Sequence, residues 1–267
     1  MPPPENYQDK KAFFERVLTV YGRKAVLEVL HDRSLSCHAI HLAESNQEKG
    51  IIGEIRHLAE ARNITVKHHS RLALSRISKN GKQDQGVAAD ILCPKFETLD
   101  HWLSNSRNRA QMRVLALDGI TNPQNLGMII RSAAAGDIDG IIWSTRGNAA
   151  LGPLVIKASA GTLYRAPMLM CDDLTKSLVQ CKEHGMKICT LEAEAKDTLF
   201  NYQSTSSVVY VLGNETQGVS RAVRALSDVA LSIPMRNGVE SLNVAITASL
   251  IAFAQPLTPA GQAGTAT

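Results

Sequence analysis

The stretch "RVLALDGITNPQNLGMIIRSAAAG", residues 113–136, joins a short apolar segment to an apolar helix through a polar turn. The apolar segment predicts a buried strand, and Gly136 stands where the C-cap of the helix belongs. Arg131 is the unusual member of this helix, because the positions around it are apolar. We expect the Arg131 side chain to be partly buried, and a partly buried guanidinium requires an anionic partner.

Short apolar strands alternate with helices in the rest of the chain. The β-like segments are residues 140–144, 187–192, 207–214 and 229–234. The helix-like segments are residues 154–161, 173–185 and 241–254, and two of them end on Gly161 and Gly185. The alternation predicts an α/β domain over residues 113–267, with a mainly parallel sheet that helices cover on both faces.

A smaller α/β domain is expected before it, over residues 13–93. Helical patterns at residues 21–31 and 51–62 are interspersed with strand-like segments at residues 38–43, 64–68 and 85–91. The polar, proline-rich residues 1–12 are expected to be a disordered lead-in. The polar residues 94–112 are expected to be a linker between the two domains.

The composition excludes several classes of protein. Of the 267 residues 44% are hydrophobic, which is enough to build a core. No apolar run approaches the roughly 20 residues of a membrane span, and no signal-like stretch opens the chain, so a cytoplasmic protein is expected. The five cysteines include no C-x-x-C pair, which disfavours a metal site and predicts reduced, mostly buried thiols.

Positive charge is concentrated in one part of the first domain. The net charge is only +4, yet residues 62–83 contain no acid. The basic residues of this run are Arg62, Lys67, Arg71, Arg76, Lys79 and Lys82. A solvated surface is one interpretation, and contact with RNA phosphates is the other. Aromatic residues make up only 4% of the chain, which favours a structured RNA over a single strand held by stacking.

Three loops follow predicted strands of the second domain, namely residues 121–133, 212–220 and 233–245. Ligands of open α/β sheets bind beyond the carboxyl ends of the strands, so the loops are expected to meet at one site. Gly213 and Gly218 have the spacing of a P-loop, but Val219 replaces the phosphate-binding lysine. No G-x-G-x-x-G motif follows a strand, which disfavours a Rossmann dinucleotide site.

The ordered motifs N-x-G-x-x-x-R, G-N-E-x-x-G and I-P-M-(x)6-L-N-V in these loops resemble those of the SpoU/TrmH family. The resemblance implies an S-adenosylmethionine-dependent RNA ribose 2′-O-methyltransferase of the SPOUT class. It also implies a homodimer and a C-terminal trefoil knot. The segments "YGRKAVLEVL" and "QGVAA" resemble the RNA-binding domain, similar to certain ribosomal proteins, of the longer family members. That domain favours large-subunit ribosomal RNA over tRNA as the substrate, and the family resemblance alone implies a guanosine as the target.

Two alternatives stay open, a tRNA 2′-O-methyltransferase and a catalytically silent RNA-binding or ribosome-assembly factor. The resemblance implies that the catalytic set is Asn125, Arg131, Glu215, Ser241 and Asn243. It implies a cofactor pocket formed by Leu212, Gly213, Gly218, Ile233, Met235 and Leu242. No metal is implied. The same residues have simpler readings, because Asn125 and Ser241 suit helix caps, the glycines suit turns and Glu215 suits the surface.

The sequence departs from the family pattern in three ways. Thr216 stands where a small residue is common, and Tyr164 stands where an acidic residue is frequent. Asn237 and Gly238 displace a glycine that commonly lies two residues after the I-P-M motif. None of these departures removes a residue of the implied catalytic set, so an active enzyme is expected.

Overall fold

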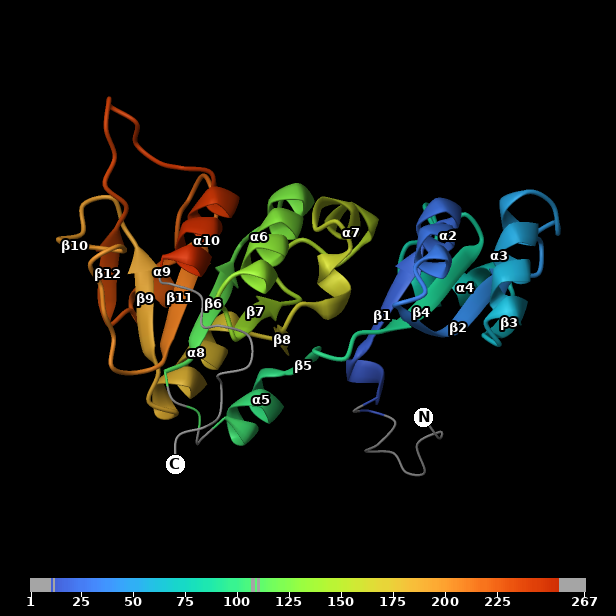
Figure 1. The fold of residues 1–267 in the computed structure, drawn as a ribbon, viewed down its shortest axis with the longest axis horizontal. Helices are drawn as coiled ribbons and strands as arrows, with labels where there is room; N and C mark the ends of the chain where they lie inside the picture. Colours follow the sequence, from blue (N-terminus) through green and yellow to red (C-terminus); the bar gives the residue numbers. More distant parts are fainter. Residues whose placement is uncertain (1–10, 12, 107–108, 110, 255–267) are drawn as a thin grey trace. The chain divides into compact units, whose positions relative to one another are not determined.

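The computed structural model describes residues 11, 13–106, 109 and 111–254. The chain divides into two compact units (Figure 1). The first ends at Lys95 and also takes in Leu151–Pro153, and the second comprises Phe96–Ala150 and the chain from Leu154 onward. The expected lead-in, residues 1–12, lies outside the described residues except for Lys11, which is helical.

The first unit is a four-stranded sheet with three described helices. The strand order is β1-β4-β2-β3, and only the β2–β3 pair is parallel. The strands are β1 (Val17–Tyr21), β2 (Ser36–Ala43), β3 (Thr65–His69) and β4 (Val87–Leu92). The helices are α2 (Arg23–His31), α3 (Ile51–Ala61) and α4 (Arg71–Ser78). The structure confirms the predicted α/β class of this unit.

Two elements of the first unit, β1 and α4, had no counterpart in the sequence prediction. α4 lies inside the basic run, whose charges mask a helical pattern with Leu74 buried. Its start carries a cap, because the Ser70 hydroxyl accepts a hydrogen bond from the Ala73 backbone N–H at 3.3 Å. The basic residues after Ser70 therefore lie on a defined helix and its flanks.

A polar cluster crosses the first unit from strand to strand. His41 lies 3.0 Å (Nε2 to Oδ2) from Asp90, and its Nδ1 lies 2.9 Å from Nε2 of His69. The Thr19 hydroxyl donates to Asp90 at 2.7 Å. Burial raises the pKa of Asp90, but the hydrogen bonds from His41 and Thr19 outweigh it and hold this pKa below 3.8. Burial lowers the pKa of His69 below 6.5, and the charge of neighbouring His41 lowers it further.

We predict that the first unit loses stability as pH falls below about 6.5. The unfolded chain protonates His69 at a higher pH than the folded chain does, so stability is complete above that pH and declines through the lowered pKa. The charges of Lys67 and His68 also lower the pKa of His69, and the charge of Glu44 raises it. Asp90 adds a second loss in stronger acid, because its folded-state pKa lies below 3.8.

Hydrogen exchange of β3 and β4 at about pH 7.5 and about pH 5.5 measures this loss. His69→Gln keeps a side-chain donor without a titrating ring and is expected to flatten the decline. His184→Gln, which changes an exposed histidine of the second unit, is the matched control. A decline of equal size in His69→Gln would contradict the assignment.

The second unit is built on an eight-stranded sheet of order β10-β12-β9-β11-β6-β7-β8-β5, and all its strand pairs are parallel. The strands are β5 (Glu97–Thr98), β6 (Arg113–Asp118), β7 (Gly140–Ser144), β8 (Met168–Cys171), β9 (Lys187–Leu191), β10 (Asp197–Thr198), β11 (Val208–Gly213) and β12 (Val229–Ser232). Parallel pairing puts every carboxyl end at one edge of the sheet. The predicted parallel sheet is confirmed.

Helices cover both faces of this sheet, as predicted (Figure 1). They are α5 (Leu99–Asn105), α6 (Pro123–Ala135), α7 (Pro153–Ala158), the 3-10 helix η1 (Thr162–Arg165), α8 (Leu174–Glu183), α9 (Arg221–Arg224) and α10 (Val244–Phe253). One core joins α5, α8 and α9 to alternate residues of the central strands. α6 and α10 pack against each other, and α10 contacts β11.

Part of the expected linker, residues 94–112, belongs to the second unit instead. Residues 97–98 form β5, which pairs with β8, and α5 follows directly. Leu99, Trp102 and Leu103 are buried in the core beneath α5. Their spacing of three and four residues puts them on one helical face, a pattern that the surrounding polar residues hid in the sequence.

α6 and α10 run side by side in the same direction, as three contacts along their length show. Asn125 and Asn243 meet at the start, and the Ser249 hydroxyl donates to Ser132 Oγ at 2.8 Å in the middle. At the end, a Cβ on Gly136 would approach Cβ of Ala252 to 2.6 Å. The trefoil knot that the resemblance implies for this segment stays a prediction.

The five cysteines are free, with Cys93, Cys181 and Cys189 buried and the other two half-buried. Burial raises the pKa of the Cys93 thiol to about 12, so it stays protonated at neutral pH. This agrees with the predicted reduced thiols. Within the described residues, no helix combines the length and apolar character needed to cross a bilayer.

Candidate active site

Three loops converge at the carboxyl edge of the large sheet, as predicted. β6 and β11 are neighbours in register, with Gly213 opposite Asp118, so the loops after them start side by side. β12 is not a neighbour of β11, because β9 lies between these two strands. The chain from β12 returns to α10, whose first turn lies against α6. The third loop is therefore brought to the site by helix packing and not by strand order.

Asn125 lies at the centre of this convergence. Its side-chain Nδ2 donates to Oε1 of Glu215, and its Oδ1 accepts from Nδ2 of Asn243 at 3.2 Å. One side-chain amide thus links α6, the loop after β11 and the start of α10. Asn125 is 7% exposed, so a bare amide here would be costly, and the two partners satisfy it at both ends.

The structure shows which residues cap α6 and α10. Asn122, not Asn125, caps α6, because its Oδ1 accepts from the backbone N–H of Gln124 at 2.8 Å. Asn243, not Ser241, caps α10 by accepting from Ala245 at 2.8 Å. Asn125 is therefore free to bridge the loops. Ser241 is exposed next to the site, and no hydrogen bond of its side chain is found among the described residues.

The loop after β11 is folded back tightly on itself. Backbone hydrogen bonds of 3.0 and 2.8 Å join Asn214 and Gly218 in both directions. A Cβ on Gly213 would lie 2.2 Å from the carbonyl carbon of Gly218, so only glycine fits this close approach. Gly218 itself has φ of 66°, which is the ordinary requirement of a turn glycine. Thr216 completes the turn by donating its backbone N–H to Asn214 at 2.9 Å.

The predicted cofactor residues lie around this loop and the segment before α10. Leu212 is buried at the end of β11, and the side chains of Ile233, Met235 and Leu242 are half-buried. Within the described chain, the backbone groups of Ile233 and Leu242 make no hydrogen bond. Free backbone donors and acceptors between apolar side chains suit the edge and faces of a purine ring.

Asn237, one of the departures from the family pattern, has a simple structural reason. It has φ of 58° and Gly238 has φ of 71°, and the Val239 backbone N–H donates to Arg236 O at 3.2 Å across them. This is a tight turn that needs left-handed backbone at both central positions. Asparagine tolerates that region better than other side chains, so the turn survives without a glycine at residue 237.

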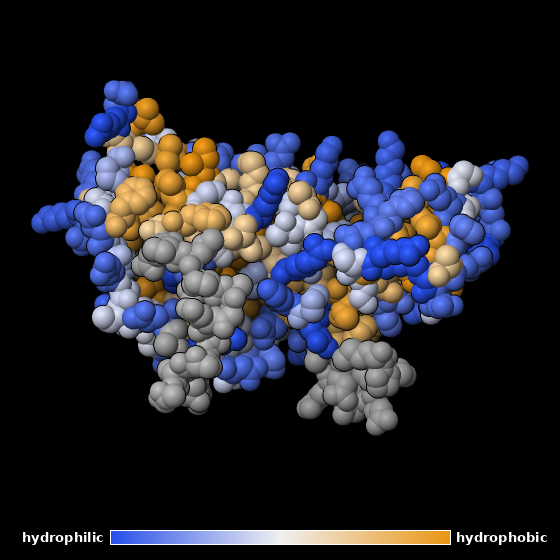
Figure 2. Space-filling view, viewed as in Figure 1, coloured by the Kyte–Doolittle hydropathy of each residue, from blue (hydrophilic) through white to orange (hydrophobic). Residues whose placement is uncertain are grey.

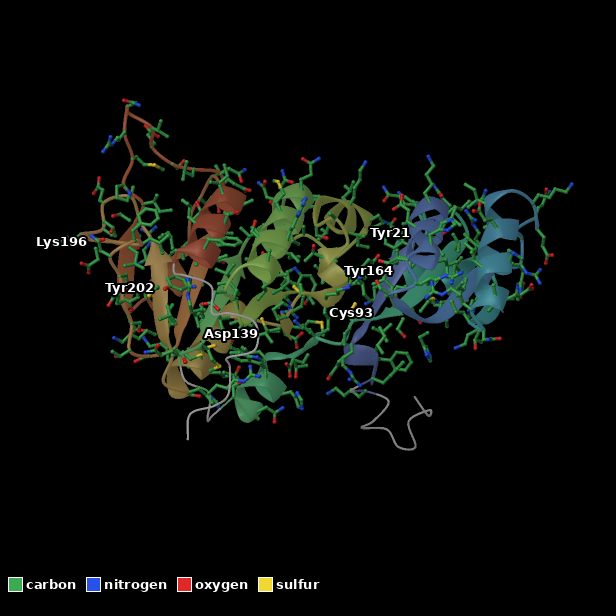
Figure 3. The ribbon with its side chains drawn as sticks, viewed as in Figure 1. Tyr21, Cys93, Asp139, Tyr164, Lys196 and Tyr202 are labelled. Carbon is green, nitrogen blue, oxygen red and sulfur yellow. The ribbon has the colours of Figure 1, made fainter. Side chains whose placement is uncertain are left out.

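Tyr164, the third departure, is 3% exposed and lies in η1, which packs against α6 (Figure 3). An acidic residue at this buried position would cost free energy unless its carboxylate were paired, whereas the tyrosine ring can be buried. Tyr164 is therefore part of the core that supports α6.

Arg131 is exposed, which contradicts the expected partial burial. It shares the solvent side of α6 with Gln124 and Met128, whereas Ile129 and Ile130 are fully buried. Sequence neighbours on a helix point in different directions, so apolar residues on either side of Arg131 do not enclose it. Arg131 also lies six residues, or about 9 Å, farther along the helix than Asn125. The structure does not bring it into the Asn125 hydrogen bonds.

The basic run of the first unit divides into two parts. Lys67, Arg71, Arg76, Lys79 and Lys82 are all exposed on β3, on α4 and in the turn after it. Arg62 is half-buried instead, and its guanidinium donates to Leu30 O at 2.8 Å and to Leu35 O at 2.6 Å. The prediction that Arg62 belongs to the RNA surface conflicts with this geometry, because these carbonyls occupy its donors in holding the turn between α2 and β2.

Sequence reasoning missed the residues that hold the loops in place. Asn214 donates its side-chain amide to Gly119 O at 2.8 Å, and Asn148 ties the next loop to the same segment. Asn122 was detectable, because asparagine before proline is a helix-start signal. Asn214 and Asn148 stand in polar loops where asparagine carries no distinguishing pattern, so only their contacts identify them.

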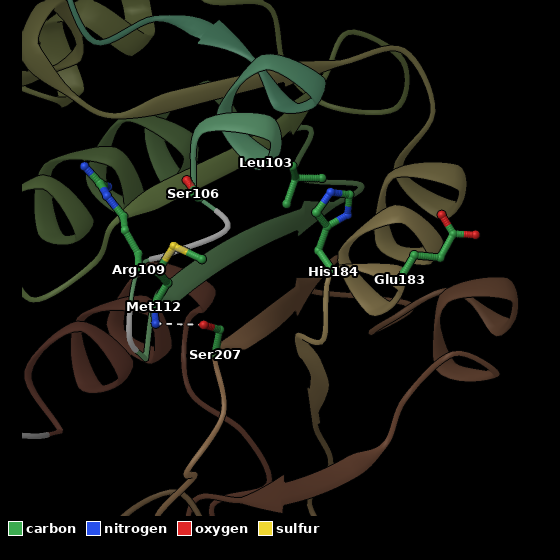
Figure 4. A pocket seen from close by; sticks show the side chains of 7 residues that line it. All are labelled: Leu103, Ser106, Arg109, Met112, Glu183, His184 and Ser207. Carbon is green, nitrogen blue, oxygen red and sulfur yellow. Dashed lines mark hydrogen bonds between the residues drawn. The ribbon is translucent and has the colours of Figure 1, made fainter.

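A cavity of about 550 Å³ lies at the opposite edge of the second unit, where β6 and β11 begin (Figure 4). Its lining is Leu103, Ser106, Arg109, Met112, Glu183, His184 and Ser207. The charges are of both signs, and the amino ends of parallel strands are not where α/β sheets bind ligands. We do not assign it to the active site.

Comparison with known proteins agrees with this architecture. The model of the SpoU rRNA Methylase family matches residues 112–253, and the model for RNA 2′-O ribose methyltransferase substrate binding matches residues 19–95. A putative TrmH family tRNA/rRNA methyltransferase of Staphylococcus saprophyticus is 32% identical over 239 residues, covering 88% of this chain and 94% of the relative. An uncharacterized tRNA/rRNA methyltransferase of Mycolicibacterium vanbaalenii is 31% identical over 233 residues, covering 87% and 74%.

Solved structures share the fold. The SpoU methyltransferase AviRb of Streptomyces viridochromogenes, in complex with AdoMet, aligns with a TM-score of 0.60 and 20% identity over 94% of this chain and 92% of its own. A putative TrmH family RNA methyltransferase of Porphyromonas gingivalis aligns with a TM-score of 0.58 and 24% identity over 92% and 91%. The chain therefore belongs to the SpoU/TrmH family of S-adenosylmethionine-dependent RNA methyltransferases.

Proposed function

We propose that this protein transfers the methyl group of S-adenosylmethionine to a ribose 2′-hydroxyl of large-subunit ribosomal RNA, at a guanosine. The observation that carries the proposal is the Asn125–Glu215–Asn243 bridge at the carboxyl edge of the sheet, beside the Gly213 loop. The match of the first unit to a substrate-binding model supports a large structured substrate. A tRNA is the second candidate, since the relatives' names include both RNA classes.

The residues present fit the cofactor. Gly213 lets the loop after β11 fold back against Gly218, and the free backbone groups of Ile233 and Leu242 suit adenine recognition. Leu212, Gly218 and Met235 complete the proposed pocket. When bound, S-adenosylmethionine supplies a methyl group on a cationic sulfonium. The chain's own task is to hold the ribose in line with that methyl and to assist loss of the hydroxyl proton.

The bridge residues are proposed to position the ribose. Glu215 and Ser241 are exposed beside buried Asn125, so they present oxygens to a substrate while Asn125 and Asn243 fix the loops. S-adenosylmethionine held in the proposed pocket would supply the methyl group to the 2′-oxygen, with its sulfur leaving as a neutral thioether. The proton of the hydroxyl passes to an RNA phosphate or to water.

Arg131 is proposed to grip the RNA phosphate beside the target ribose and to stabilise the developing alkoxide. A guanidinium cation donates hydrogen bonds and has no acceptor atom, so Arg131 is not proposed as the group that takes the hydroxyl proton. Exposure supports this role, since within the described residues the Arg131 side chain makes no hydrogen bond or ion pair and faces solvent. The planar fork of arginine can hold a phosphate and an oxygen at once.

Arg131→Ala is expected to slow single-turnover methyl transfer by about 2–4 kcal/mol of barrier, the loss typical of one preorganised donor. The melting temperature and the affinity for S-adenosylmethionine are expected to stay at the wild-type values, because the side chain is exposed and lies outside the proposed pocket. Arg131→Lys is expected to recover part of the rate, since lysine keeps the charge without the fork.

The assay follows the cofactor's labelled methyl into ribosomal RNA and tRNA, and nuclease mapping locates the 2′-O-methyl group. Wild-type protein that binds S-adenosylmethionine but labels neither RNA would favour a silent binding factor. Label in tRNA alone would favour the second candidate. A full single-turnover rate in Arg131→Ala would exclude the catalytic role of Arg131.

The exposed basic residues of β3 and α4 are proposed to bind RNA phosphates. Reversing Arg71 and Lys79 to Glu is expected to weaken RNA binding and to reduce the slope of log affinity against log salt by about 2. Cofactor affinity should not change. The matched control reverses Lys176 and Lys196, two exposed lysines of the second unit. An equal effect in both double variants would show that net charge, and not this surface, governs binding.

A homodimer is proposed through the outer side of α6 and α10. Met128 is 40% exposed, Ile246 52% and Phe253 49%, and Figure 2 shows hydrophobic surface over α10. α10 is apolar on all sides, which is unusual for a helix facing solvent. A second copy with the same apolar surface would cover it by a two-fold contact.

Solution mass at micromolar concentration tests the dimer. Wild type is expected to be a dimer, and the variant with Ile246→Lys and Phe253→Glu a monomer. Leu72→Glu, at an exposed leucine of α4, is the control and should stay dimeric. A monomeric wild-type protein would contradict the proposal.

A further inference from the structure

The loop between β7 and α7, residues 145–152, begins beside the candidate active site. β7 is the neighbour of β6 in the parallel sheet, so both strands end at the same edge. The loop bears none of the residues assigned above to cofactor or catalysis. One of its side chains, Asn148, nevertheless makes hydrogen bonds to the ends of both β6 and β7 at the carboxyl edge of the sheet.

The Asn148 amide is used at both ends. Its Oδ1 accepts from the backbone N–H of Ile120 at 2.7 Å, and its Nδ2 donates to Leu117 O at 3.0 Å. The same Nδ2 lies 3.3 Å from Ser144 O and 3.1 Å from Ser144 Oγ. The next residue, Ala149, donates its backbone N–H to Ile120 O at 2.8 Å. The end of β6 is thereby tied to the end of β7.

The segment that Asn148 holds leads directly into the active site. After β6 the chain passes through Gly119, with φ of 76°, and Ile120 to the α6 cap at Asn122. Asn214 holds the other side of this segment through Gly119 O. Two asparagines from different loops therefore fix the path by which the chain enters α6, and Asn125 lies one turn beyond that cap.

We propose that Asn148 is a positioning residue for methyl transfer, which acts by fixing the 118–122 segment and through it the side chain of Asn125. The proposal rests on the function proposed above. The hydrogen bonds of the Asn148 side chain go to Ile120, Leu117 and Ser144, and none goes to a proposed cofactor residue or to Glu215 or Ser241, so its proposed action is through the backbone it holds.

The position of Asn148 gives it a signature that a general stabilising role lacks. The proposed cofactor residues belong to β11, the loop after it and the segment between β12 and α10, and both β11 and β12 lie on the other side of β6 from β7. Loss of the Asn148 amide should therefore disturb Asn125 and the rate, and leave cofactor affinity unchanged. Loss of the Asn214 amide should disturb both, because Asn214 lies within the Gly213 loop itself.

The experiment uses Asn148→Ala and Asn148→Asp in the full chain, with Thr145→Ala as the control. Thr145 is exposed in the same loop, and its side chain makes no hydrogen bond in the described structure. Three quantities are measured: amide hydrogen exchange of residues 118–125 and of β11, the dissociation constant for S-adenosylmethionine, and the single-turnover rate with RNA. All are measured well below the melting temperature of each variant.

In Asn148→Ala we expect faster exchange across residues 118–125, unchanged exchange in β11, unchanged cofactor affinity and a rate at least tenfold lower. Asn148→Asp keeps the acceptor for Ile120 but loses the donor, so its rate relative to wild type should rise as acid protonates the new carboxyl group. Thr145→Ala should match wild type in every measurement.

The outcomes separate this inference from the proposed function. Unchanged exchange across residues 118–125 in Asn148→Ala would overturn the positioning role whatever the turnover. A normal rate despite faster exchange would overturn it too, as would a parallel loss of cofactor affinity. If wild type binds the cofactor yet transfers no methyl group to any RNA, the proposed function fails. The role of Asn148 in catalysis then fails with it, although faster exchange in Asn148→Ala would still show that Asn148 holds residues 118–125.

Discussion

The side-chain amide of Asn125 joins three segments that are far apart in the sequence. It bonds Glu215 after β11 and Asn243 at the start of α10, and it does so from a buried position on α6. A buried amide left without partners would destabilise the fold, so the three loops must arrive together. The geometry of the proposed ribose and cofactor site follows from that requirement.

Close backbone approach makes this convergence possible. Gly213 lies against the Gly218 backbone, Gly136 lies against Ala252, and Gly127 lies where a Cβ would come within 2.7 Å of Val155 O. At each point a side chain would push two segments apart and lengthen the hydrogen bonds that Asn125 makes. Glycine is needed here for space more than for backbone freedom, because none of the three has positive φ.

Side-chain amides hold most of the loops around the site, and the Asp118 carboxylate adds one bond by accepting from the Ser220 backbone N–H at 2.7 Å. Asn122, Asn148, Asn214 and Asn243 each bond backbone groups of a turn or helix start, through distances of 2.7–3.4 Å. An amide can donate and accept at once without the desolvation cost of a buried ion. Charge is kept for the surface, where Arg131 and the basic residues of α4 are free to meet an anionic partner.

The sequence by itself determined the parallel sheet, its covering helices and the meeting of three loops, because periodicity and strand direction are local properties. It misjudged the burial of Arg131, the partners of the Arg62 guanidinium and the assignment of residues 97–105 to a linker. The neighbours of a residue in sequence do not define what surrounds its side chain in space. Only the tertiary structure decided that Asn125 bridges while Asn122 and Asn243 cap, and that Asn148 and Asn214 hold the loop between them. The physical reason is that an asparagine amide suits a cap, a turn or a bridge equally, and its role is set by which backbone groups packing leaves within reach.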